Sequence, residues 1–191
     1  MAKADSKDGT STATRLVAAA MAEFCEHGYG GTDSNRIARR AGFAPQTFYR
    51  WFQDKAAVFV AAYEDWQAAE RDLLLPLLAA NAPGHSLAAA ILAHHRDFRL
   101  FRRSLRQLAV EQPAIRRARA ESRQRQIAAL GALAPAPGPD PAELAVALFE
   151  IERLADAAAE GEFADLGLTE APAAAAIAAL LDRLRHLRET R

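Results

Sequence analysis

The sequence predicts an all-α protein with about nine helices. Apolar residues recur at helical spacing along most of its 191 residues, and no stretch alternates apolar and polar residues as a half-buried strand would. Glycine or proline separates successive segments, and helices commonly end at such residues. Hydrophobic residues make up 51% and charged residues 25% of the chain, a balance typical of a globular protein with a buried core.

Four helices are expected in the first part of the chain. Their predicted ranges are about 11–28, 32–41, 44–52 and 54–76. Gly28 and Gly42 end the first and second of these helices. Asp54 is a suitable N-cap for the fourth, and Pro76 should end or kink it. Residues 1–9 are expected to form a polar tail.

Five further segments are expected after residue 81. In chain order they are a helix capped by Ser86 with a break near 98–103, an arginine-rich helix over about 114–133, an extended proline-rich segment over 134–141, a helix that starts at Asp140 and Pro141, and a last helix after a loop over 161–169. Asp140, Pro141 and Glu143 form the sequence of a helix N-terminus, with a cap, a first-turn proline and an acidic third residue.

Charge is strongly segregated along a chain whose formal net charge is zero. Residues 96–125 carry ten arginines against three acidic residues, whereas residues 140–191 carry five basic against eleven acidic residues. Two interpretations stay open for the arginine-rich segment. Its arginines can pair with the acidic C-terminal helices, or they can bind an anion such as DNA phosphate or an acidic effector, for example an acyl-coenzyme A.

Several classes of protein are disfavoured. The single cysteine, Cys25, cannot form an intramolecular disulfide, and no secretory signal or membrane span is recognisable, so a cytoplasmic protein without membrane association is expected. No nucleophile–histidine–acid set or phosphate-binding glycine loop stands out, so neither an enzyme nor a cofactor is expected. His94 and His95 are adjacent and lack the spacing of a helical zinc pair, so no metal is expected.

Residues 28–55 carry the functional signal. Two short helices flank a turn that contains a glycine, which is the arrangement of a helix-turn-helix whose second helix enters the major groove of DNA. Phe48 and Phe52 can anchor that second helix in the core, because they are four residues apart. Gln46, Thr47, Tyr49 and Arg50 then remain outside, and these residue types suit contacts with base edges and phosphates. The predicted domains are 10–55, with the motif at about 34–53, and 56–191.

This segment resembles the TetR family of bacterial transcriptional regulators over about residues 10–60. The residues that carry the resemblance are Phe24, Gly28, Tyr29, Thr32, Ile37, Ala38, Ala41, Gly42, Phe48, Tyr49, Phe52 and Lys55. The resemblance implies that residues 44–51 form the recognition helix, that Thr32 and Ser34 touch the DNA backbone, and that Lys55 binds phosphate at the start of the fourth helix. The family usually has an aliphatic residue in place of Ser34, and often serine or threonine in place of Ala44.

The predicted DNA contacts follow from the motif and the resemblance together. They are Thr32, Ser34, Ala44, Pro45, Gln46, Thr47, Tyr49, Arg50, Trp51 and Lys55. Four aromatic residues within residues 48–52 cannot all face one core, since only positions three or four apart share a helix face. Tyr49 or Trp51 is therefore expected on the DNA side.

The resemblance also implies that the C-terminal domain binds a small effector and that its last two helices form a homodimer. The effector pocket is predicted between the helices that start near Lys55, Ser86 and Ala114. Its predicted lining is Trp66, Leu74, Ile91, Phe98 and Leu105, with His94 or His95 and Gln107 or Glu111 as polar groups. The dimer seam is predicted to contain Leu144, Leu148, Ile151, Leu180, Leu181, Leu184 and Leu187.

The function expected from these features is a ligand-responsive transcriptional regulator, a repressor that a small effector releases from a palindromic operator in double-stranded DNA. Two alternatives stay open. One is a helical small-molecule sensor or enzyme that does not act on DNA, and the recognition-helix residues argue against it. The other is an architectural DNA-binding protein without an effector.

Overall fold

The protein is all-α, as expected. A computed structural model describes residues 11–132 and 139–189, and within these ranges it contains ten helices and no strand. The helices are α1 (Thr12–His27), α2 (Ser34–Arg40), α3 (Pro45–Tyr49), α4 (Lys55–Ala79), α5 (Gly84–Asp97), α6 (Arg99–Glu111), α7 (Pro113–Ala132), α8 (Pro141–Glu160), α9 (Glu162–Asp165) and α10 (Ala171–Glu189). None of the described helices is long and apolar enough to cross a bilayer.

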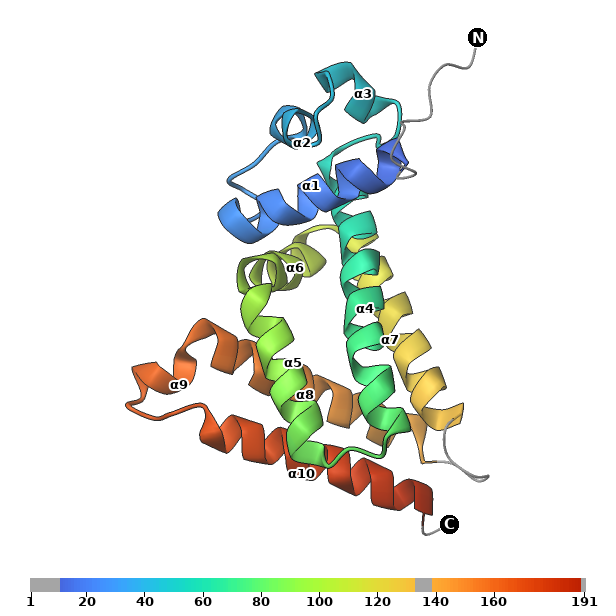
Figure 1. Ribbon diagram of the computed structural model, residues 1–191, viewed down its shortest axis with the longest axis vertical. Coiled ribbons are helices and arrows are strands. Elements are labelled where there is room, and N and C mark those ends of the chain that lie inside the picture. The colour runs from blue at the N-terminus through green and yellow to red at the C-terminus, as the bar shows by residue number, and fades with distance from the viewer. Residues whose placement is uncertain (1–10, 133–138, 190–191) are drawn as a thin grey trace.

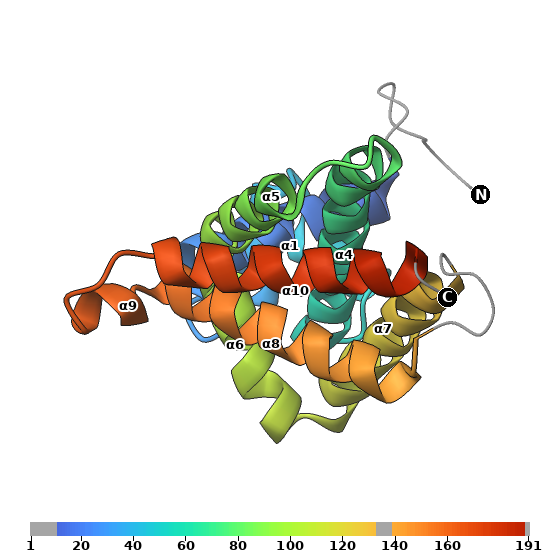
Figure 2. The same ribbon diagram turned by 90° about the horizontal axis from the view of Figure 1, so that it is seen from below.

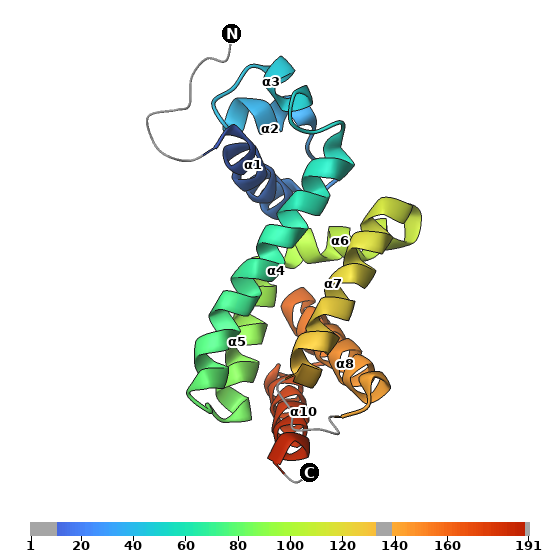
Figure 3. The same cartoon turned by 90° about the vertical axis from the view of Figure 1, so that its right-hand side faces the viewer.

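The helices form a small head and a larger body. Helices α1 to α3 make the head at one end of the molecule, and α4 runs from the head down the body beside α7 (Figure 1). Helices α8 and α10 lie side by side across the opposite end (Figure 2). Helix α6 lies across the middle, between the head and α8 (Figure 3). The two regions predicted to contact DNA and a second subunit therefore lie at opposite ends of one subunit.

Most of the expected boundaries agree with the structure to within a few residues. The break expected near residues 98–103 is at Phe98, between α5 and α6. The expected loop over 161–169 contains the short helix α9, which raises the count from nine to ten. The polar tail over residues 1–9 and most of the extended segment over 134–141 lie outside the described residues.

Pro76 does not end the fourth helix, because α4 continues through it to Ala79. Proline removes one backbone donor, so the carbonyl of Asp72, four residues earlier, loses its helical partner. Both residues lie on the exposed side of the helix, where water can bond that carbonyl. The cost of a proline within a helix is therefore reduced at this position.

The helix expected to start at Ser86 begins instead at Gly84, and no side chain of its own segment caps it. The backbone N–H of Gly84 donates to Asp182 Oδ1 of α10 at 3.0 Å. A Cβ atom on residue 84 would lie 2.4 Å from the carbonyl oxygen of Ala178. The start of α5 is thus fixed by a close backbone approach to α10, a long-range contact that a local sequence pattern cannot reveal.

Two groups of buried apolar residues hold the subunit together. The larger group spans the head and the body, because Phe24 of α1 and Phe59 of α4 pack against Phe101 of α6, with ring centroids 6.4 Å and 4.9 Å from it. The smaller group joins α5, α8 and α10 around residues such as Ile91 and Ile177. The apolar core thus continues across residue 55, and the division into domains at that residue remains a prediction.

Charged side chains fill the space between α6, α7 and α8. We call this set the arginine–carboxylate cluster; its members are Arg102, Arg106, Arg119, Arg123, Glu152, Asp156 and Glu160. Arg102 is 1% and Asp156 2% exposed, and two hydrogen bonds of 3.0 Å join them. The arginine-rich segment thus pairs with acidic residues of α8, as the first of the two interpretations predicts.

Glu152 binds three arginines within this cluster. Arg119 and Arg123 donate hydrogen bonds to it, and Arg102 lies 3.7 Å away. Burial by itself would raise the pKa of this carboxyl group, but the hydrogen bond from Arg123 and the neighbouring positive charges outweigh burial and lower its pKa from 4.5 to about 2. Burial would also raise the pKa of Asp156. Hydrogen bonds from His95 and Arg102 outweigh burial, so the pKa of Asp156 lies far below its usual value.

These pKa shifts predict an acid-sensitive fold. A carboxyl group whose pKa is lower in the folded state stabilises the protein above its unfolded pKa, and this contribution is lost as the pH falls toward the folded pKa. Glu152→Gln should therefore lower the free energy of unfolding by about 3 kcal/mol at neutral pH. The difference in the free energy of unfolding between the variant and the unmodified protein should shrink below about pH 4.5. Urea unfolding curves recorded from about pH 7 to about pH 3 measure this difference.

Glu64→Gln, at an exposed position of α4, is the matched control and should change stability by less than about 0.5 kcal/mol. An unchanged difference between the Glu152→Gln and unmodified proteins across this pH range would show that the cluster does not hold Glu152 ionised.

Candidate nucleic-acid interface and ligand site

The predicted recognition helix, α3, is a single short turn. It begins at Pro45 after Ala44, which offers no side-chain cap, and ends at Tyr49, three residues earlier than expected. Phe48 is fully buried, and its carbonyl accepts hydrogen bonds from the N–H groups of Trp51 and Phe52. A helix this short has little stability alone, so the burial of Phe48 and the half-burial of Phe52 hold it in place.

The outer side of α3 and of the turn after it carries polar and aromatic side chains. Gln46 and Arg50 are exposed, as predicted. Tyr49 is 58% and Trp51 53% exposed, although aromatic side chains of this size usually contribute to a core. Thr47 and Pro45 are half-buried. Helix α3 lies at the end of the molecule farthest from α10 (Figure 1).

Ser34 makes a contact inside the head, and the DNA backbone contact expected of it remains a prediction. Its Oγ lies 2.7 Å from the hydroxyl oxygen of Tyr49, so a hydrogen bond joins the first residue of α2 to the last residue of α3. An aliphatic residue at this position could not make this bond. The departure from the usual family residue thus fixes the direction in which Tyr49 leaves the surface.

Thr32 is also used inside the head. Its side chain is 5% exposed, and its hydroxyl donates to Glu23 Oε2 at 2.7 Å. Burial would raise the pKa of Glu23, but hydrogen bonds from Thr32 and Arg40 and the charge of Arg36 outweigh burial and lower this pKa. The hydroxyl of Thr32 thus holds a buried carboxylate in place, and its predicted contact with the DNA backbone would have to come from the main chain.

Lys55 connects the start of α4 to the loop between α1 and α2. Its Nζ donates to the carbonyl oxygens of Tyr29 and Thr32 at 2.7 and 2.9 Å and lies 4.0 Å from the centroid of the Tyr29 ring. Burial lowers the pKa of this ammonium group. An ammonium group has three hydrogens, and two of them are used here, so the predicted phosphate contact depends on the third.

The residues predicted to bind an effector lie in several places. Trp66, His94, His95 and Phe98 come together: the Trp66 and His94 rings stack with centroids 4.8 Å apart, and His95 and Phe98 meet the edges of Trp66. Leu105 belongs to the larger apolar group, whereas Ile91 belongs to the smaller one and Leu74 packs against it. Gln107 and Glu111 are exposed and bond to each other at 3.0 Å.

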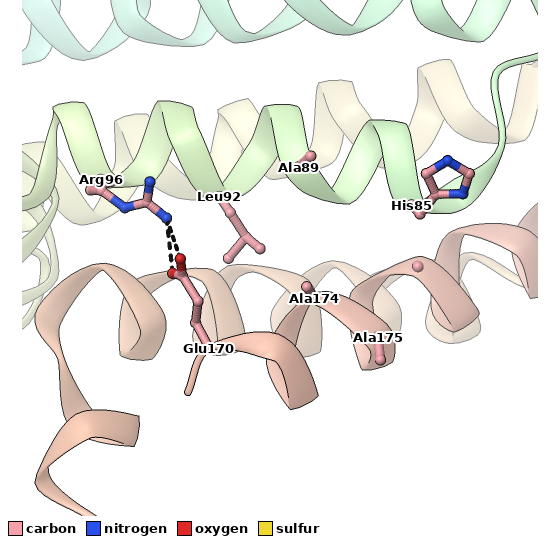
Figure 4. A pocket seen from close by; sticks show the side chains of 8 residues that line it. His85, Ala89, Leu92, Arg96, Glu170, Ala174 and Ala175 are labelled. Atoms are coloured by element: carbon pink, nitrogen blue, oxygen red, sulfur yellow. Dashed lines mark hydrogen bonds and ion pairs between the residues drawn. The ribbon is translucent and has the colours of Figure 1, made fainter. Parts of the chain in front are cut away.

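Two surface hollows lie elsewhere. One, of about 360 Å³, lies between α5 and α10; small alanine side chains line it, and the ion pair of Arg96 and Glu170 crosses one end (Figure 4). The other, of about 590 Å³, lies between α8 and α10 beside Phe149, Leu154 and Leu180. Neither includes any residue predicted for the effector pocket, so that pocket remains a prediction.

The contacts that sequence reasoning missed are long-range ones. His95 Nδ1 lies 2.9 Å from Asp156 Oδ1, and Arg102 lies over the Trp66 ring at 4.7 Å. Ser104 accepts the backbone N–H of Tyr29 at 3.1 Å, which ties α6 to the head. The density of arginine in residues 96–125 indicated an ionic partner, but the sequence alone could not select Asp156 and Glu152 among the eleven acidic residues of the C-terminal segment.

Comparison with known proteins supports the assignment of the head. The profile of the bacterial regulatory proteins of the tetR family matches residues 16–62, from α1 into α4. An uncharacterised HTH-type transcriptional regulator of Bacillus subtilis, YdgC, is 34% identical over 73 residues, which are 38% of this chain and 37% of the relative. The match thus spans little more than a third of that relative's length.

Solved structures resemble the whole chain in fold. A TetR-family transcriptional regulator of Rhodococcus sp. has a TM-score of 0.71 at 16% identity, over 91% of this chain and 97% of the other. A transcriptional regulator of Streptomyces coelicolor has a TM-score of 0.67 at 22% identity, over 90% and 98%. The multidrug binding protein EbrR, complexed with imidazole, has a TM-score of 0.68 at 17% identity, over 90% and 95%. The N-terminal part of this chain thus resembles the bacterial regulatory proteins of the tetR family, and its whole fold resembles solved structures that include a TetR-family regulator.

Proposed function

We propose that this protein is a homodimeric transcriptional repressor, rather than an enzyme, that binds a palindromic operator in the cytoplasm and releases it when a small effector binds. The observation that carries the proposal is the exposed face of α3. Gln46 and Tyr49 of α3 and the two residues of the turn after it, Arg50 and Trp51, are exposed. The inner residue of the helix, Phe48, is fully buried. Two large aromatic side chains that are more than half exposed thus lie beside an exposed arginine.

The chemistry of this face suits duplex DNA. Glutamine and arginine can form paired hydrogen bonds with base edges in the major groove, and tyrosine can donate to a phosphate oxygen. The hydrogen bond between Ser34 and Tyr49 orients Tyr49 before DNA binds, which lowers the entropic cost of the contact. The alternative of a helical sensor or enzyme without a DNA target would leave these features without a role.

The surface of α8 and α10 supports the homodimer. Val146 and Phe149 are 55% and 49% exposed, and Phe149 and Leu180 are among the residues that line the hollow between the two helices. Leu144 and Ile151, which were expected in the seam, are buried within the subunit at 3% and 9% exposure. The seam would therefore use the opposite side of α8, and Leu187 lies outside the residues whose side chains are described.

The release step is supported by what a structural relative binds. The relative EbrR is a multidrug binding protein whose structure contains imidazole. In this chain, α4 extends from Lys55, in the head, to Trp66, within the body. A ligand that moved the lower part of α4 would thus move the head as well, and two heads in a dimer would no longer match successive major grooves.

The DNA contacts are tested by substitution on α3. DNA from upstream of the protein's own gene should bind in a gel shift. Gln46→Ala should reduce the discrimination between bases at one position of each half-site by about 1–3 kcal/mol. The double substitution Tyr49→Ala and Arg50→Ala should abolish specific binding. Arg117→Ala, at an exposed position of α7, is the control and should bind normally. Unchanged affinity of the double variant would refute the assignment.

Lys55 should affect both stability and DNA affinity. Lys55→Ala leaves the carbonyl oxygens of Tyr29 and Thr32 without their donor, which should lower the free energy of unfolding by about 2 kcal/mol. It should also weaken binding to all DNA sequences alike. The dependence of the affinity on salt concentration should fall by the amount that about one phosphate contact contributes. Chemical unfolding and gel shifts over a range of salt concentrations measure the two effects separately. An unchanged salt dependence would leave Lys55 with the structural role alone.

The dimer is tested by charge on the exposed apolar face. Phe149→Glu should weaken dimerisation about a hundredfold, because a hydrated carboxylate would replace an apolar side chain at the seam. Val110→Glu is the matched control, since Val110 is 83% exposed but lies on α6. Sedimentation equilibrium should give monomers for the first variant and dimers for the second at micromolar concentration. A dimeric Phe149→Glu protein would place the seam elsewhere.

A further inference from the structure

A short segment projects from the end of the helix pair α8 and α10. We call it the α9 arm; it comprises residues 161–170 and contains α9 and the turn that leads into α10 (Figure 2). All residues from 164 to 170 are exposed. They include Leu166, at 75%, and Leu168, at 51%. Two neighbouring leucines thus leave apolar area in water that a contact with another surface would remove.

Ion pairs fix both ends of the α9 arm on the body. Arg153 of α8 donates two hydrogen bonds to Glu162, at 3.0 and 2.5 Å. Arg96 of α5 donates two to Glu170, at 2.7 and 2.9 Å. Paired bonds between a guanidinium group and a carboxylate restrict direction as well as distance. In this position, the leucines of the arm are not among the residues that line the hollow between α8 and α10 of their own subunit.

Backbone hydrogen bonds fix the leucines within the arm. The N–H groups of Leu166 and Leu168 donate to the carbonyl oxygen of Phe163 at 3.1 and 2.9 Å. Gly167, between the two leucines, has a φ of 71°, which a residue with a side chain rarely adopts. The turn therefore presents both leucines to solvent in a defined conformation. A group ordered in advance loses little conformational entropy when it binds a partner.

The hollow between α8 and α10 offers a complementary surface. Phe149 and Leu154 of α8 and Ala176 and Leu180 of α10 are four of the six residues that line its volume of about 590 Å³. Water in the hollow would find few hydrogen-bond partners on these side chains. Phe149 is 49% exposed, so a leucine placed in the hollow would also cover part of that ring.

The charges beside the two surfaces are opposite. The α9 arm contains three acidic residues and no basic residue, and Asp165 is exposed next to Leu166. Arg183 is exposed on α10, three residues after Leu180 and therefore on the same side of the helix. An arm that approached the hollow of another copy would thus bring opposite charges together, which favours the encounter.

The spacing of the arm and the hollow suits a two-fold dimer. Leu154, in the lining of the hollow, lies six residues before Glu160, the last residue of α8, which is about 9 Å along the helix. A two-fold axis between them would place each arm on the hollow of the other copy, because a two-fold interface repeats every contact with the copies exchanged. Near this axis α10 carries the exposed residues Ala171 and Ala175, whose small side chains let two helices approach closely.

We propose that the α9 arm docks into the hollow between α8 and α10 of a second copy of this chain, where Leu166 of each subunit completes the apolar lining of the other. The inference rests on the proposed function, whose homodimer it extends by an exchanged arm. The exchange is reciprocal, so each dimer buries two arms and two hollows. The seam therefore includes the segment between the last two long helices as well as the helices themselves.

Chemical cross-linking tests the contact directly. Cys25→Ala removes the single cysteine, and Leu166→Cys or Ala176→Cys is then introduced into chains that carry different tags. After the two variants are mixed and have exchanged subunits, a short bismaleimide linker should join one chain of each kind far more often than two of the same kind. In the control mixture, Val110→Cys, at an 83% exposed position of α6, replaces Leu166→Cys and should yield no linked pair.

Substitution of the leucines tests how much the contact contributes to dimerisation. Leu166→Ser with Leu168→Ser should weaken dimerisation at least about tenfold, because apolar area that the dimer buries is lost. Both side chains are exposed in the single subunit, so circular dichroism should show unchanged helix content. Leu73→Ser with Leu75→Ser, which removes leucines of α4 that are 42% and 49% exposed, is the matched control and should dimerise normally in sedimentation equilibrium.

Sedimentation and cross-linking together separate the exchanged arm from the homodimer itself. A dimer that gives no more linked product than the control mixture, or that keeps its affinity without Leu166 and Leu168, would overturn the exchanged arm and leave the homodimer intact. An unmodified protein that sediments as a monomer at micromolar concentration would overturn both.

Gel shifts separate the arm from DNA binding. The variant without Leu166 and Leu168 should bind a full palindrome more weakly and a single half-site normally, because α3 is unchanged and only the pairing of two heads is affected. Equal affinity of this variant and the unmodified protein for the palindrome would count against the arm. A dimer with exchanged arms that never binds DNA would refute the proposed repressor and leave the arm contact.

Discussion

The body of this protein is organised by the need to neutralise one buried guanidinium group. Arg102 is 1% exposed, and an unpaired charge at that depth would cost several kcal/mol. Asp156 and Glu152 supply the negative charge from α8, and Trp66 covers the face of the guanidinium. These contacts fix how far along α8 the helix α6 can lie, because a shift of either helix by one residue would separate the charges. Apolar packing alone would set that alignment less strictly, since one aliphatic contact can replace another.

The same helix explains why the head and the body form one continuous core. Helix α6 places Arg102 toward α8 and Phe101 toward the aromatic rings of α1 and α4. Two rigid connections thus join the halves, α4 through its backbone and α6 through its side chains. A single connection would let the head rotate about it, whereas the second connection restricts such rotation. Movement of the head therefore requires movement within the body, a property expected of a regulated DNA-binding protein.

The sequence predicted features that depend on neighbouring residues and missed those that depend on distant ones. Glycine and proline marked most helix ends, and the spacing of Phe48 and Phe52 predicted the inner side of α3. Gly84 was not recognised as a helix start because its partner, Asp182, is far along the chain. The exposure of Gln46 and Arg50 was predicted, but the internal bonds of Ser34 and Thr32 were not, because a hydroxyl suits DNA and protein acceptors equally. The proposed effector residues were chosen by residue type on three helices, and packing divided them among separate groups.

Helix α3 has only five residues and no side-chain cap, so its shape depends on Phe48 and Phe52 beneath it rather than on its outward residues. Gln46, Arg50 and Trp51 point away from the protein and make few contacts that the fold requires. Mutations at these positions can consequently accumulate without unfolding the head, and each one offers selection a new set of hydrogen-bonding groups. Under the proposed function, duplicated copies of the gene can diverge toward different operators while they keep the same scaffold. Tyr49 is more constrained than its neighbours, because a substitution there also removes the bond to Ser34.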